Sequence, residues 1–121
     1  MTVQKRAAVL AVMALAVALG LLLHGAIPQP EAYHAFADAR PMLGLPNALN
    51  VLSNVPFLLG GLWGLIRAPR WRPRLKDEGE ARAYLGFFAG VALTSLGSSY
   101  YHWAPDSVTL FWDRMPMAMA F

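Results

Sequence analysis

The chain has 121 residues, of which 57% are hydrophobic and only 14% are charged, and its mean hydropathy is +0.42. Soluble domains average roughly 25% charged residues, so this composition predicts an all-α bundle of transmembrane helices and not a soluble domain. The absence of cysteine excludes disulfides and thiolate metal sites, and the net charge of +3 comes without an aromatic or Gly-rich platform for nucleic acid.

The first predicted span covers residues 7–27, an uncharged run of 21 residues that follows Lys5 and Arg6. About 20 apolar residues are enough to cross a bilayer as a helix. The run is longer than the roughly 7–15 apolar residues of a usual signal peptide, so we expect a retained span and not a cleaved signal sequence. His24, near the far end of the run, is typical of a residue at the membrane interface.

The second predicted span covers residues 45–66, which are also uncharged, and a polar connection with several prolines over residues 29–44 precedes it. Pro56 lies in the middle of this span. A proline in a membrane helix removes one backbone hydrogen bond, which neighbouring groups can compensate. We therefore expect a kinked helix at this position.

Three asparagines mark one side of the second span. Asn47, Asn50 and Asn54 are separated by three and four residues, so they share one face of the expected helix, with Ser53 beside them. Amides in a hydrocarbon environment need hydrogen-bond partners. This face is therefore expected to point into the bundle, where holding helices together is its simplest role.

Residues 67–82 are predicted to form a cytoplasmic loop of a multi-pass protein in a bacterial inner (cell) membrane. They contain six of the ten basic residues of the chain: Arg67, Arg70, Arg72, Arg74, Lys76 and Arg82. Short loops rich in Lys and Arg stay on the cytoplasmic side of a membrane. This orientation places the connection before the second span, and the turn after the third, on the outer side.

The third predicted span covers residues 83–104, and the fourth covers residues 107–121 and is incomplete. Between them, Pro105 begins a tight turn in which Asp106 or Ser107 is a good N-cap for the fourth helix. Fifteen residues do not cross a bilayer comfortably. We therefore expect residues 1–121 to be the N-terminal part of one longer transmembrane domain.

The third span carries a row of small and polar residues at intervals of four, which are Gly86, Gly90, Thr94, Ser98 and His102. Such spacing forms a ridge along a helix, and its small members permit close approach of another helix. Close packing accounts for the glycines and the threonine, but not for a large titratable group at the end of the row.

Asp113 lies inside the fourth apolar run, where a carboxylate is costly and is by default a sign of function. Its neighbour Arg114 points about 100° away on a helix, although it could still pair with another group nearby. In an antiparallel hairpin, Ser98 and Asp113 each lie about 9 Å from the turn at 1.5 Å per residue, and His102 lies one helical turn closer to it. We therefore expect the three side chains to converge.

These residue types suit hydrolysis. A neutral imidazole is a good zinc ligand, a carboxylate can take a proton from an attacking water, and a hydroxyl can donate to an oxyanion. The segment Gly97-Ser98-Ser99-Tyr100-Tyr101-His102, with Asp113 eleven residues further on, resembles the Ser-x-x-x-His and downstream Asp of the alkaline ceramidases. These enzymes belong to a superfamily of seven-helix membrane proteins that includes the progestin and adiponectin receptors. The segment from Asn50 to Phe57 resembles the Asn-x-x-Ser-Asn stretch of the same family.

The resemblance, which covers residues 33–121, implies a zinc hydrolase that cleaves the amide of ceramide or a related lipid amide in sphingolipid metabolism. It implies that His102 is one of three zinc ligands, that Ser98 supports the oxyanion or bound water, and that Asp113 orients or deprotonates that water. The other two ligands come from a C-terminal His-x-x-x-His motif that this chain lacks. The family's acidic calcium cluster is matched only by Glu31 and Asp38, and Asn47 stands where another carboxylate is expected, so calcium binding is doubtful.

Two other functions fit the same residues. The first is a non-catalytic, receptor-like member of the superfamily, and the second is a transporter or proton relay that uses His102 and Asp113. Because a catalytic zinc usually needs three protein ligands, the 121-residue chain alone is expected to be inactive. His24 and His34 lie on the same expected side as His102, but one loop and two separate helices would preorganise a metal site poorly.

Overall fold

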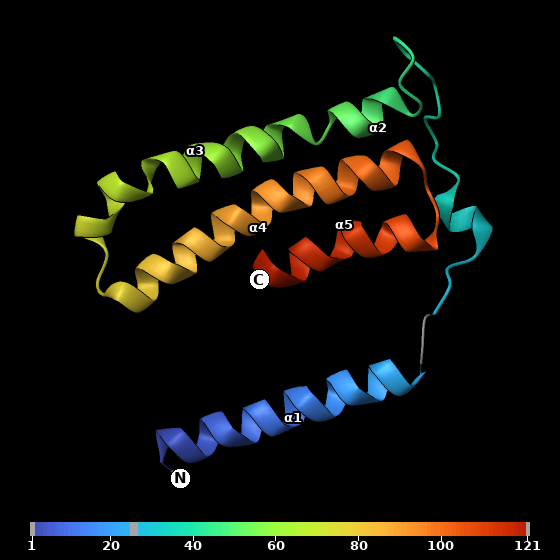
Figure 1. Cartoon of the computed structure of the whole chain (residues 1–121). Helices are drawn as coiled ribbons and strands as arrows, with labels where there is room; N and C mark the ends of the chain where they lie inside the picture. Colours follow the sequence, from blue (N-terminus) through green and yellow to red (C-terminus); the bar gives the residue numbers. More distant parts are fainter. Residues whose placement is uncertain (1, 25–26, 121) are drawn as a thin grey trace.

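The computed structural model describes residues 2–24 and 27–120, and these residues confirm the predicted all-α class (Figure 1). Within them the backbone forms no strand, and a lone bridge pairs Met42 with Leu45. Five α-helices and two short 3-10 helices follow one another along the described chain: α1 (Val3–His24), η1 (Glu31–His34), α2 (Ala48–Leu52), α3 (Val55–Trp71), η2 (Arg72–Arg74), α4 (Glu78–Trp103) and α5 (Ser107–Ala120).

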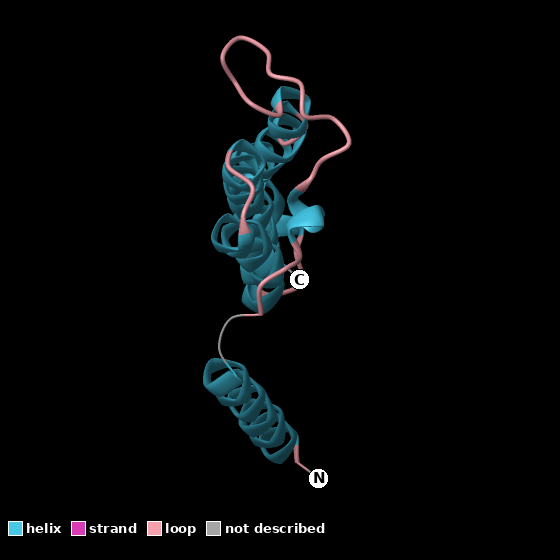
Figure 2. Ribbon diagram, turned by 90° about the vertical axis from the view of Figure 1, so that its right-hand side faces the viewer, coloured by secondary structure: helices cyan, strands magenta, loops and turns pink. Residues whose placement is uncertain are grey.

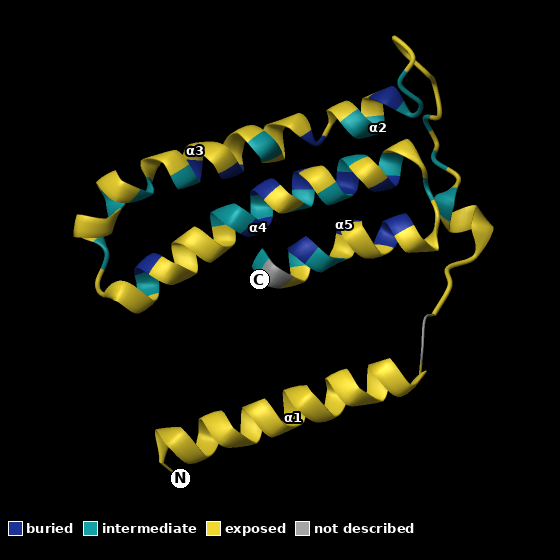
Figure 3. Ribbon diagram, viewed as in Figure 1, coloured by how far each residue is buried: buried dark blue, intermediate teal, exposed yellow. Residues whose placement is uncertain are grey.

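The first helix, α1, is exposed along its whole length (Figure 3). Its 22 residues make it about 33 Å long at 1.5 Å per residue, which matches the ~30 Å hydrocarbon core of a bilayer. The helix begins four residues before the predicted span 7–27 and ends at His24, whereas residues 25–26 of that span lie outside the described part. An uncovered apolar surface of this size indicates contact with lipid or with another protein.

The second predicted span is divided into two helices. α2 ends at Leu52, and α3 begins at Val55 after a short break at Ser53 and Asn54. The break has a local cause, because Pro56 has no N–H to donate to the carbonyl of Leu52. The kink that the sequence predicts therefore falls just before the proline.

The segment 67–82, predicted as a cytoplasmic loop, is helical at both of its ends. α3 continues to Trp71, and α4 already begins at Glu78, so η2 and three further residues form the connection. Arginine is a good helix former, which allows the basic residues to extend α3. At the other end, the Asp77 carboxylate accepts a hydrogen bond from the Glu80 amide at 2.9 Å and thereby caps α4.

The third and fourth predicted helices form the expected antiparallel hairpin, α4 and α5 (Figure 1). The predicted N-cap is confirmed, because the Asp106 carboxylate accepts a hydrogen bond from the Thr109 amide. In return, the Thr109 hydroxyl accepts from the Asp106 amide at 3.0 Å and donates to the Ala104 carbonyl at 2.7 Å. These bonds fix the direction in which the chain enters α5.

Two of the described helical stretches are long and apolar enough to cross a membrane, namely α1 and the stretch Ala48–Arg74. α4 has sufficient length, with 26 residues, but its serines, tyrosines and glycines lower its hydropathy. α5 has 14 residues and is too short. Length and composition thus support two of the four predicted spans.

The helices α3, α4 and α5 lie side by side in one layer, with α4 in the middle (Figures 1 and 2). η1 lies at the end of this layer where α4 turns into α5. The buried residues are mostly small: the buried apolar ones are Ala48, Ala81, Ala92, Tyr101 and Leu110. Small residues between helices allow close backbone approach, which is typical of helix packing in membranes.

Candidate functional site

The face of α5 that packs against α4 carries a carboxylate. Thr109, Asp113, Pro116 and Ala120 follow one another at intervals of four, three and four, so they form one stripe along α5. All are buried or half-buried, and Asp113 is only 5% exposed. The predicted intramembrane carboxylate therefore lies in the seam between the two helices of the hairpin.

Gly97 is the residue of α4 that brings the two helices together at this level. A Cβ atom at Gly97 would collide with the carbonyl oxygen of Trp112 and would lie 3.4 Å from the amide nitrogen of Asp113. Pro116 has no N–H for the carbonyl of Trp112, which leaves this oxygen free of its usual helical partner. The free carbonyl thus points at the one residue type that can accommodate it.

The two carboxylate oxygens of Asp113 differ in their surroundings. Oδ2 lies 3.4 Å from Nε of Arg114, whereas Oδ1 is buried and has no hydrogen-bond partner among the described residues. Arg114 also donates from Nη2 to the Tyr33 hydroxyl at 2.7 Å. Arg114 thus pairs with another group nearby, as the sequence allowed, and its long side chain also folds back to its neighbour.

His102 is half-buried near the turn between α4 and α5. Its ring lies 4.7 Å from that of Phe36, and its carbonyl accepts a hydrogen bond from the Asn47 amide at 2.8 Å. Nδ1 of His102 is buried and has no partner among the described residues.

Ser98 is 7% exposed and follows Gly97, so it lies at the level of Asp113, as predicted. No hydrogen bond in the described part of the chain joins the side chains of Ser98, His102 and Asp113 to one another. The structure thus brings the three to the half of the hairpin nearer the turn, without a hydrogen bond between them in the described residues.

The predicted row from Gly86 to His102 does not form a single packing face. Each step of four residues turns about 40° beyond a full turn, so the row rotates by about 160° over its length. Gly90 faces α5, where a Cβ would lie 2.8 Å from the Cα of Ala120, but a Cβ at Gly86 would have no described atom within 4 Å. Among the described residues, no helix approaches Gly86 closely.

Sequence reasoning missed a polar network between η1 and the hairpin. Nδ1 of His34 lies 3.0 Å from the Tyr101 hydroxyl, and its Nε2 lies 3.4 Å from the Ser107 hydroxyl. Tyr33 adds the contact with Arg114. No local sequence pattern predicts these pairs, because their members are 67 to 81 residues apart.

The expected role of the asparagines in holding helices together is found only in part: in the described residues the Asn47 amide bonds to α4, at the His102 carbonyl, whereas the other two bond to a loop or to their own turn. Asn50 donates to the Asp38 carbonyl at 2.6 Å, Asn54 donates to the Asn50 carbonyl at 3.0 Å, and Ser95 of α4 donates to the Asn54 carbonyl at 2.8 Å. Asn47 precedes α2 in a left-handed conformation with φ of 47°, so it is not part of a shared helix face. The amides compensate carbonyls where the helix begins and breaks.

Of the two carboxylates expected near a calcium site, Asp38 is paired with an arginine and Glu31 is exposed. The Arg40 guanidinium donates to both oxygens of Asp38, at 2.9 and 2.7 Å, and holds the pKa of that carboxyl at about 2, below its usual 3.8. Glu31 is exposed in η1. Among the described residues no three His, Asp or Glu side chains form a group that could hold a metal ion, and His24 is exposed at the end of α1.

Comparison of the chain with known protein families, with curated proteins and with solved structures found no match. The fold and the site therefore define its class by themselves. In its described residues this is an all-helical protein with two stretches long and apolar enough to cross a membrane, and its helical hairpin carries a buried carboxylate and a half-buried imidazole.

Proposed function

We propose that this chain forms part of a multi-pass hydrolase of a bacterial inner membrane, which cleaves the amide bond of ceramide or a related lipid. The single observation that carries the proposal is the state of Asp113, which is 5% exposed and has one oxygen without a partner among the described residues. A buried acceptor left unpaired costs about 1–3 kcal/mol, so a fold retains one where it has a use. The resemblance to the alkaline ceramidases implies that this use is to orient or deprotonate the attacking water.

The membrane placement is supported by the surface of the layer. Large apolar side chains are exposed along α1, α3 and α4, including Leu59, Ile66 and Leu96, which are 62%, 75% and 57% exposed. In water this surface would need to be covered. In this proposal lipid or further helices cover it, and the basic connection around η2 faces the cytoplasm.

In this proposal Asp113, Ser98 and Arg114 each have a task that their positions permit. Oδ1 of Asp113 is free to accept a proton from a water that attacks the amide carbonyl. The Ser98 hydroxyl, at the same level, is suited to donate to the developing oxyanion. Arg114 balances the negative charge of Asp113 from its other oxygen, at 3.4 Å.

Zinc, which the family resemblance implies, fits the described residues in part. The unpaired Nδ1 of His102 is a suitable imidazole ligand. A catalytic zinc takes three protein ligands, and the described residues offer no group of three. We therefore assign one ligand to His102, require two others from outside these residues, and derive no step through the metal.

The test is hydrolysis of a fluorescent ceramide by the protein made from its complete gene, together with its zinc content. Asp113→Asn should abolish turnover while zinc is retained, and His102→Gln should lower both. Asp106→Asn, which preserves a capping side chain, and His24→Gln, at an exposed position, are the matched controls and should change neither. Full hydrolysis by Asp113→Asn would refute the proposal.

A proton relay is the second candidate function, because Asp113 and His102 both keep an unpaired polar atom in a buried position. Such pairs of titratable groups are typical of proton pathways in membranes. This function predicts proton flux through proteoliposomes that Asp113→Asn stops, with no release of fatty acid. The two assays, release of fatty acid and proton flux, therefore separate the hydrolase from the relay.

A further inference from the structure

A second feature of the fold lies at the opposite end of α4 from Ser98, His102 and Asp113. A cavity of about 360 Å³ opens between the end of α3, η2 and the beginning of α4. Its walls include Leu65, Trp71, Tyr84, Leu85 and Phe88. Phe88 and Ser98 are ten residues apart, or about 15 Å along the helix, so this cavity is separate from the proposed reaction centre.

The cavity is large enough for part of a ligand, since ligand pockets begin at roughly 300 Å³. Aromatic rings form part of its wall: the ring of Trp71 lies 5.4 Å from that of Phe88, and on its other side 5.1 Å from that of Trp63, which lies outside the cavity. Phe88 fits over Gly64, where a Cβ atom would collide with its ring. Tryptophan and tyrosine in this arrangement are typical of the boundary between hydrocarbon and water.

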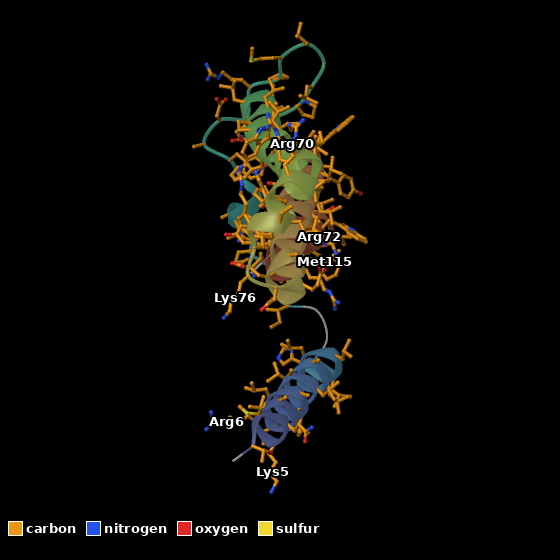
Figure 4. The ribbon with its side chains drawn as sticks, turned by 90° about the vertical axis from the view of Figure 1, so that its left-hand side faces the viewer. Lys5, Arg6, Arg70, Arg72, Lys76 and Met115 are labelled. Carbon is orange, nitrogen blue, oxygen red and sulfur yellow. The ribbon has the colours of Figure 1, made fainter. Side chains whose placement is uncertain are left out.

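The residues that flank the cavity along the chain form a cationic rim: Arg72 lines the cavity, and Arg70, Arg74 and Lys76 are each next to a lining residue. Residues 67–82 contain six basic and three acidic side chains, a net charge of +3. In the described part of this region the only salt bridge joins Arg72 to Glu78, at 2.7 Å, and Asp77 is occupied as the cap of α4. Arg70 and Lys76 are exposed, and Figure 4 shows them with Arg72 around this end of the bundle.

An apolar cavity with a cationic rim is complementary to a molecule that has an acyl chain and an anionic head. We propose that this end of the α3–α4 pair binds one anionic phospholipid of the cytoplasmic leaflet. Its acyl chain lies against Trp71 and Phe88, and its phosphate is held by Arg70, Arg74 and Lys76. Guanidinium groups bind phosphate with several parallel hydrogen bonds, which suits them to this role.

The lipid site rests on the membrane placement proposed above but not on hydrolysis. Each Lys or Arg near an anionic surface strengthens binding by about fivefold. We therefore expect anionic lipid to be enriched at Trp71 by about fivefold or more over zwitterionic lipid. Removing the three rim cations should abolish this preference.

The experiment uses the full chain with Trp71 as its only tryptophan, the other three being replaced by phenylalanine. The protein is reconstituted in phosphatidylcholine vesicles that contain a minor fraction of either brominated phosphatidylglycerol or brominated phosphatidylcholine, and quenching of Trp71 fluorescence is compared. Stronger quenching by the brominated phosphatidylglycerol is expected. In the combined Arg70→Gln, Arg74→Gln and Lys76→Gln variant, both brominated lipids should quench Trp71 fluorescence equally.

Two controls make the result specific. Lys5→Gln with Arg6→Gln removes the cations at the beginning of α1 and should leave the preference at Trp71 unchanged. A protein with Trp112 as its only tryptophan, on α5, should show no preference. Equal quenching of Trp71 by both lipids would overturn the lipid site alone, whereas no quenching by either lipid would overturn the membrane placement and the lipid site together.

Discussion

The contact between Gly97 and α5 gives the most direct test of the hairpin that positions Asp113. In Gly97→Ala the added methyl group collides with the Trp112 carbonyl oxygen and lies 2.8 Å from its carbonyl carbon. These are backbone atoms of a helix, so no side-chain rotation relieves the collision. The two helices must move apart at the level of the carboxylate.

The magnitude follows from a comparison with Gly86→Ala, the same change in the same helix. At Gly86 the methyl group has no described atom within 4 Å, so only helix propensity changes, and alanine should stabilise α4 by about 0.8–1 kcal/mol. Gly97→Ala has the same gain but adds an overpacking cost, typically 1–3 kcal/mol, and near the upper limit for a backbone contact. The free energies of unfolding of the two variants should therefore differ by about 3 kcal/mol.

The assay is equilibrium unfolding in mixed detergent micelles, followed by far-UV circular dichroism, on both variants and the parent protein. Gly86→Ala should unfold at higher denaturant than the parent and Gly97→Ala at lower. If both variants were stabilised equally, α4 and α5 would not touch at Gly97, and the buried position of Asp113 would be wrong as well.

Three further predictions concern the rest of the fold. In Gly61→Ala the added Cβ would lie 2.6 Å from the backbone of α4, so the free energy of unfolding should fall by about 1–3 kcal/mol in the same assay. Gly60→Ala, whose Cβ meets open space, should not lower it. Asp106→Ala should cost about 1 kcal/mol through loss of the α5 cap, and Asp106→Asn much less, as measured by the same unfolding. Arg40→Gln should return the pKa of Asp38 from about 2 toward 3.8, as measured by NMR titration. Because the folded-state pKa is the lower one, the carboxylate stabilises the parent above about pH 4 and loses this contribution as the pH falls toward 2, a dependence that Arg40→Gln should remove.

The sequence by itself determined which segments are helical, and some of their ends, because these depend on residues that are neighbours along the chain. The uncharged apolar runs predicted α1, α3 and α4, and Pro56 predicted the break before α3. Asp106 predicted the cap of α5. An error arose where two local signals compete, since the basic residues after Ile66 suit both a loop and an exposed helix end.

The sequence also indicated Asp113 as unusual, because a carboxylate in an apolar run is costly wherever the chain folds. Its placement in the α4–α5 seam agrees with its spacing from Thr109 and Pro116. The fold class and this one anomalous residue were thus accessible from local chemistry alone.

Only the tertiary structure decided which residues meet. Gly97 and not Gly86 contacts α5, because a helix turns about 100° per residue and positions four apart drift away from a shared face. His34 pairs with Tyr101, and Arg114 with Tyr33, across 67 and 81 residues. The cavity beside Trp71 likewise needs three separate elements to form its walls. Such contacts depend on how helices are oriented in space, which no spacing within one helix encodes.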